Sequence, residues 1–162
     1  MNLYVATLFW LHLIGMVFWV GASFIGPVVL LPSLRVLEPE GRSRFMGEYS
    51  RRLAPITGIA ILIVVITGVL QTGTLYGGLS AMIFHRVLSA KIGIAVLMIA
   101  NGVYIGYGLG PRIARLAPSP GTPPPLEFLK AQRSLIRHSW IQAAMGVVIL
   151  FVVGLLSAPP AA

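Results

Sequence analysis

Four long stretches of the chain carry no formally charged side chain. They run over Met1–Leu34, Leu53–Phe84, Ile92–Gly110 and Ser139–Ala162. A helix needs about 20 apolar residues to cross the hydrocarbon core of a bilayer, and each stretch provides about that length. The alternating segments that a barrel would require are absent. The pattern therefore predicts an all-α polytopic membrane protein. We expect one domain over residues 1–162, a bundle of four transmembrane helices at about 3–31, 53–73, 87–110 and 139–158.

The composition excludes several classes of protein. Hydrophobic residues make up 57% of the chain and charged residues only 10%, whereas a soluble domain carries about 25% charged residues. Cysteine is absent, which excludes disulfides, thiolate metal sites and cysteine nucleophiles. Aspartate is also absent, and there are only 4 acidic residues, all glutamate. Paired-carboxylate catalysis and carboxylate cages for hard cations are therefore disfavoured.

Basic residues gather in two segments between the predicted spans. Residues 32–52 and 111–138 each hold five, so together they hold ten of the 12 lysines and arginines. The positive-inside rule places both segments in the cytoplasm and both termini outside. The sequence thus predicts a multi-pass protein of the cell (inner) membrane, whose basic charge faces the lipid bilayer and not nucleic acid. Residues 35–52 read as a short polar helix, and the proline-rich residues 117–125 as an extended spacer.

Ionisable side chains inside a span are costly and are functional candidates. His12 lies nine residues beyond Leu3, about 14 Å deep at 1.5 Å per residue. Lys91 lies five residues beyond Arg86, about 8 Å deep by the same rise. Its amine either extends outward to the headgroups or turns into the bundle near the depth of His12. The alternative role for His12 is a hydrogen bond across a helix interface.

Small residues on the faces of His12 and Lys91 leave room for a flat ligand between helices. Imidazole is a common axial ligand of haem iron, and a deprotonated lysine can also bind iron. Burial in lipid favours the deprotonated form of lysine. His12 and Lys91 are therefore candidate axial ligands of a haem, beside the hydrogen-bonded role of His12 and the outward-facing role of Lys91, which the residues alone leave open. Arg86 is the only arginine on the predicted outer side, so it is the expected partner of outward-facing propionates.

The segments Leu11–Gly21 and Leu88–Leu97 resemble helices of two related membrane groups. One is the HemJ-type protoporphyrinogen oxidases, and the other is the CopD-like domain linked to copper resistance. Residues 52–70 and 154–160 are similar to the second helix and the CopD-like ending, so the resemblance covers almost the whole chain. The HemJ resemblance implies haem association through a first-helix histidine and a third-helix lysine, which match His12 and Lys91. The sequence lacks other HemJ histidines, which favours haem binding over protoporphyrinogen oxidation itself.

The leading interpretation is an integral-membrane b-type haem-binding protein with a redox or haem-handling role. Quinone, porphyrin, a redox protein and a second copy of the chain are candidate partners. The sequence leaves open whether the chain is an enzyme; the activity that the resemblance implies is that of an oxidoreductase. Two alternatives remain. One is CopD-like copper transport or resistance, with Cu(I) held by the thioether of Met82 and the imidazole of His85. The other is a cofactor-free structural subunit of a membrane complex.

Overall fold

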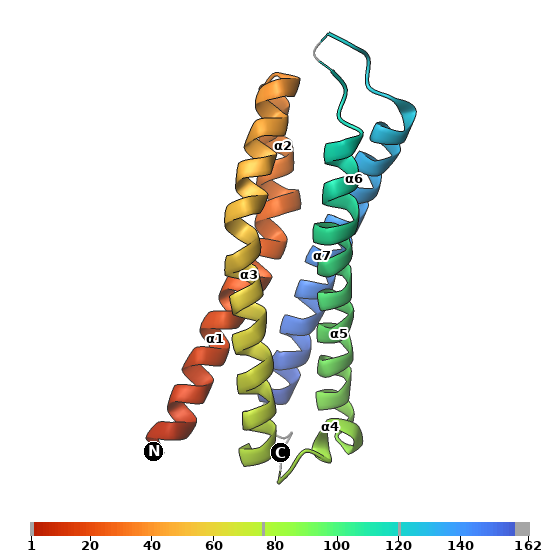
Figure 1. Ribbon diagram of the computed structural model, residues 1–162. Helices are drawn as coiled ribbons and strands as arrows, with labels where there is room; N and C mark the ends of the chain where they lie inside the picture. Colours follow the sequence, from red (N-terminus) through yellow and green to blue (C-terminus); the bar gives the residue numbers. More distant parts are fainter. Residues whose placement is uncertain (1, 76, 120, 158–162) are drawn as a thin grey trace.

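Four long helical segments make up the fold (Figure 1). The residues that the computed structural model describes, 2–75, 77–119 and 121–157, include no strand. Each segment is long and apolar enough to cross a membrane. The candidate spans are Leu3–Val36, Arg44–Leu75, Arg86–Arg115 and Leu126–Leu156. The predicted all-α fold with four membrane-spanning helices is therefore confirmed.

Two of the four segments are composite and two are single helices. The first consists of α1 (Leu3–Phe24), the π-helical η1 (Ile25–Leu30), α2 (Leu31–Ser33) and the short 3-10 helix η2 (Leu34–Val36). The second is α3 (Pro39–Leu75). The third follows the short helix α4 (Ala81–Phe84) and consists of α5 (Arg86–Val103), the π-helical η3 (Tyr104–Leu109) and α6 (Gly110–Arg115). The fourth is α7 (Leu126–Ser157).

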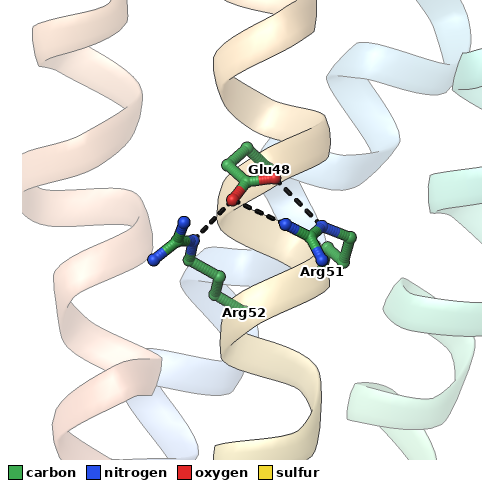
Figure 2. A network of polar contacts seen from close by, with 3 residues as sticks. All are labelled: Glu48, Arg51 and Arg52. Atoms are coloured by element: carbon green, nitrogen blue, oxygen red, sulfur yellow. Dashed lines mark hydrogen bonds and ion pairs between the residues drawn. The ribbon is translucent and has the colours of Figure 1, made fainter.

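The second and fourth helices begin well before their apolar spans. Residues 39–52, within the stretch expected to form a separate short helix, continue without a break into the second span. In this first part of α3, Glu48 accepts hydrogen bonds from Arg51 and Arg52, three and four residues further on (Figure 2). Such spacings place side chains on one helical face and support the helix. An established helix is also cheap to extend, because nucleation is the costly step.

A similar extension carries α7 back to Leu126, well before the predicted residue 139. Glu127 in its first turn pairs with Lys130 at 3.1 Å. Glu127 also pairs with Arg112 of α6 at 3.2 Å. This ion pair connects the end of the third segment to the start of the fourth. Residues 117–119 and 121–125 form no helix, as the prolines there predict.

The bundle is built from two helical hairpins. α1 packs along α3, and α5 packs along α7; the hairpins meet chiefly through α1 and α7, while α3 and α5 make few contacts. The shared core draws on all four segments and contains Met16, Trp19, Val20, Ala60, Val64, Met98 and Ile149. The first hairpin is tight because Gly15 faces α3. A Cβ at Gly15 would lie 2.8 Å from Val64 Cγ2 and 3.0 Å from the Ala60 carbonyl oxygen.

Each hairpin's first helix ends in a six-residue π-helical turn beside a Gly-Pro pair. Gly26-Pro27 lies within η1, and Gly110-Pro111 follows η3 directly. Proline has no amide proton and clashes with the preceding helical turn, so a wider turn relieves both problems. Such π-helical turns occur often at functional sites.

The beginning of α1 and the end of α7 lie at the same end of the bundle as α4 (Figure 1). α2, α6 and the connection from α6 to α7 lie at the opposite end (Figure 1). This arrangement is what four spans require, because an even number of crossings returns the chain to its starting side. The location of that side outside the cell stays a prediction.

Candidate functional site

His12 projects from α1 toward α3, where its Nδ1 lies 2.8 Å from Thr67 Oγ1. The Thr67 hydroxyl also lies 2.6 Å from the Ile63 carbonyl oxygen. A carbonyl can only accept, and a hydroxyl has one proton, so Thr67 donates to Ile63 and must accept from His12. The neutral His12 ring therefore carries its proton on Nδ1. Its lone pair is on Nε2.

His12 Nε2 is buried and has no hydrogen-bond partner in the part of the chain that the structure describes. An unpaired buried polar atom costs about 1–3 kcal/mol, and native proteins contain few of them. A lone pair held in an apolar bundle, with the other ring nitrogen fixed by a hydrogen bond, is the arrangement of a metal-binding imidazole.

Three features of α3 hold the imidazole in place. Thr67 is one, and Gly68 is the second: a Cβ there would lie 3.4 Å from His12 Cε1, so the ring lies against the helix surface. The third is Gln71, whose Nε2 donates to the Leu8 carbonyl oxygen at 3.0 Å. In an α-helix that carbonyl also pairs with the His12 amide. Sequence analysis missed Thr67 and Gln71, although two polar residues four apart in an apolar span mark one helical face.

Lys91 lies on α5 and is half-buried. Like Nε2 of His12, its amine makes no hydrogen bond or ion pair with any residue in the described ranges. The two residues also occupy equivalent places in the hairpins. His12 precedes the start of η1 by 13 residues, and Lys91 precedes the start of η3 by 13 residues. The two predicted ligands thus lie at corresponding positions along their helical segments.

The other predicted residues lie where α5 begins. Arg86 is the first residue of α5, and its side chain is exposed. His85 is the N-cap of α5, and its Nδ1 accepts a hydrogen bond from the Leu88 amide at 3.3 Å. This contact gives His85 a role in starting the helix. The hydrogen bond also occupies Nδ1, one of the two ring nitrogens of His85. In the copper hypothesis, one of these two nitrogens would bind Cu(I) together with Met82.

The residues in the described ranges include no group of three or more His, Cys, Asp or Glu side chains that could hold a metal ion. Haem iron takes only one or two protein ligands, so a haem site would not produce such a group. No protein-family model, curated protein or solved structure matches the chain.

Proposed function

We propose that the chain is an integral-membrane haem-binding protein in which His12 Nε2 is an axial ligand of the iron. The observation that carries this proposal is the buried Nε2 lone pair without a partner, on a ring whose tautomer Thr67 fixes. Outer hydrogen bonds of this kind orient a ligating histidine and raise its basicity. The surrounding apolar bundle would exclude water from the iron.

In this proposal Lys91 is the second axial ligand, and Arg86 pairs with the propionates. Lys91 is half-buried and makes no hydrogen bond or ion pair with any residue in the described ranges. Only the neutral amine has a lone pair for iron, and burial favours that form. Arg86 is exposed at the start of α5, where an arginine can pair with carboxylates at the membrane edge.

The role that we propose is redox or haem-handling. Haem supplies one-electron transfer when it is bound, and a quinone, a porphyrin or a redox protein is the proposed partner. The resemblance of the His12 and Lys91 segments to HemJ-type and CopD-like proteins supports this class. An apolar four-span bundle supports a multi-pass location, and we propose the cell (inner) membrane.

The test is the absorption spectrum of protein purified in mild detergent. We expect a Soret band in the native protein and its loss or strong shift in His12→Ala, with normal membrane insertion. His85→Ala is the matched control and should keep the native spectrum, because its ring caps a helix. A colourless native protein that carries copper would support the copper alternative. A colourless protein with neither metal would support a structural subunit.

A further inference from the structure

A second, partly buried polar cluster joins α5 to α7. Asn101 Nδ2 donates to Gln142 Oε1 at 2.7 Å and to the His138 carbonyl oxygen at 3.1 Å. Because a carbonyl can only accept, these contacts fix the orientation of the Asn101 amide. Its Oδ1 therefore faces His138 Nδ1, 2.6 Å away, and the imidazole must donate. The neutral His138 ring carries its proton on Nδ1, as His12 does.

The lone pair of His138 is consequently on Nε2. That nitrogen makes no hydrogen bond to any residue within the described ranges. His138 Nε2 is not enclosed, because the His138 side chain is half-buried. Among the described residues, the unpaired side-chain atom that is fully buried is Nε2 of His12. His138 thus presents an oriented hydrogen-bond acceptor at the surface of a membrane helix pair. An oriented acceptor without a protein partner favours a ligand that donates.

An aromatic side chain lies beside this acceptor. The Tyr104 ring meets the His138 ring edge-on, with centroids 4.9 Å apart. Tyr104 is the first residue of η3 and is 45% exposed. Its ring also covers Gly108, where a Cβ would lie 3.1 Å from Tyr104 Cδ2, whereas a Cβ at Gly106 would meet nothing within 4 Å. The π-helical turn therefore places the Tyr104 ring beside the acceptor atom, His138 Nε2.

The cluster lies near the basic end of the bundle. His138 directly follows Arg137, and Arg133 lies little more than one turn before it. Asn101 is ten residues beyond Lys91, which places it about 15 Å further along α5. Both arginines lie within α7 just before the apolar span predicted at 139–158, and basic residues at such a boundary reach into the headgroup layer. Molecules that reach His138 are therefore amphiphiles at the boundary between hydrocarbon and headgroups.

We propose that His138 Nε2 accepts a hydrogen bond from a hydroxyl of a membrane-dissolved hydroquinone, whose ring packs against Tyr104. A hydroquinone has the O–H donor that the Nε2 lone pair needs, whereas the oxygens of the oxidised quinone only accept. The site therefore selects the reduced form. This inference deepens the proposed redox function by naming the electron donor class, but the binding is measurable without reference to haem.

One other source supplies the same donor chemistry. The headgroup of phosphatidylglycerol carries free hydroxyls, and Arg133 and Arg137 would attract its phosphate. The Tyr104 ring favours an aromatic partner, since aromatic rings pair with a preferred geometry. The test therefore separates hydroquinone from lipid.

The native protein, with ¹⁵N-labelled histidine, is placed in phosphatidylcholine nanodiscs at pH 8. The probes are tetramethylhydroquinone, its dimethyl ether and tetramethylquinone. We expect the hydroquinone to bind and to move the His138 Nε2 resonance. The ether and the quinone, which cannot donate, should bind at least about tenfold more weakly, as expected for one lost hydrogen bond. Equal affinity for the three probes would overturn the proposal.

His138→Asn is the variant that tests the residue. Its amide can still donate to Asn101, so the cluster stays paired, but it has no group in the place of Nε2. We expect about a tenfold loss of hydroquinone affinity with an unchanged melting temperature, and no loss in the control His85→Asn. Undiminished binding by His138→Asn would overturn the proposal, and the probe series on the native protein decides the matter if this variant does not fold.

Two further measurements complete the design. If nanodiscs containing phosphatidylglycerol move the His138 resonance without hydroquinone, and hydroquinone does not reverse the change, the occupant is the lipid and the proposal is wrong. Haem binding and hydroquinone binding are read out separately, the first as the Soret band of the native protein and the second as the His138 resonance. A missing Soret band would therefore count against the haem proposal alone, and a missing hydroquinone effect against this one alone.

Discussion

At the scale of single residues, Thr67 decides the chemistry of His12. Thr67→Val removes the acceptor of the Nδ1 proton and leaves that donor unpaired in an apolar setting. We expect a loss of about 1–3 kcal/mol in the free energy of unfolding and about a 10- to 100-fold loss of haem affinity. Thr67→Ser keeps the hydroxyl and should stay close to native. Haem titration and thermal unfolding measure the two effects. Native haem affinity in Thr67→Val would show that this hydrogen bond does not prepare the ligand.

Lys91 is the second residue whose role a substitution can decide. Lys91→Arg keeps a positive charge but cannot bind iron, because arginine stays protonated. If Lys91 is an axial ligand, Lys91→Arg should lose the native Soret and visible bands. Lys91→Met, which supplies a soft thioether, should keep haem with an altered reduction potential. A native spectrum in Lys91→Arg would instead assign the amine to the headgroup region.

The residues that sequence analysis found and those that it missed differ in kind. His12 and Lys91 were predicted because an ionisable side chain in an apolar span is conspicuous and costly. Thr67 and Asn101 are uncharged, and such residues are common in membrane helices. Their importance depends on how each helix is rotated against its neighbour, which one sequence does not specify. Only the packed structure shows that they orient the two histidines.

At the scale of elements, the crossing of α1 over α3 depends on Gly15. Gly15→Ala places a Cβ 3.0 Å from the Ala60 carbonyl oxygen, a backbone atom that cannot turn aside. We expect a destabilisation of about 1–3 kcal/mol, the usual cost of overpacking. Gly21→Ala is the matched control in the same helix, because its Cβ would meet nothing within 4 Å. It should be neutral or slightly stabilising, as alanine favours helix. Thermal unfolding in detergent compares the two, and equal stability would contradict a tight crossing.

The elements themselves were predicted unevenly for a physical reason. Absence of charge marks the part of a helix that lipid can cover, so all four spans were found. It does not mark where the helix ends. α3 begins at Pro39 and α7 at Leu126, well inside polar sequence, because helix formation depends on backbone pairing and side-chain propensity. The π-helical turns were not predicted, although both lie beside the Gly-Pro pairs.

At the scale of the whole molecule, orientation is the property to test. The structure places the beginning of α1 and the end of α7 at one end of the bundle, and the basic segments lie at the opposite end (Figure 1). Reporter fusions at residues 42 and 122 should therefore report the cytoplasm, and a fusion after residue 162 should report the outside. A cytoplasmic signal from the last fusion would reverse the predicted orientation or change the number of spans.

The division into two hairpins has a consequence for biosynthesis. His12 meets Thr67, and Leu8 meets Gln71, within the first pair of spans; Asn101 meets His138 and Gln142 within the second. Each pair can therefore form these hydrogen bonds as soon as its own two helices are in the bilayer. A nascent chain that leaves the translocon pair by pair never has to expose these groups to lipid while it waits for the other half. The late step, docking of α1 on α7, then joins mainly apolar surfaces.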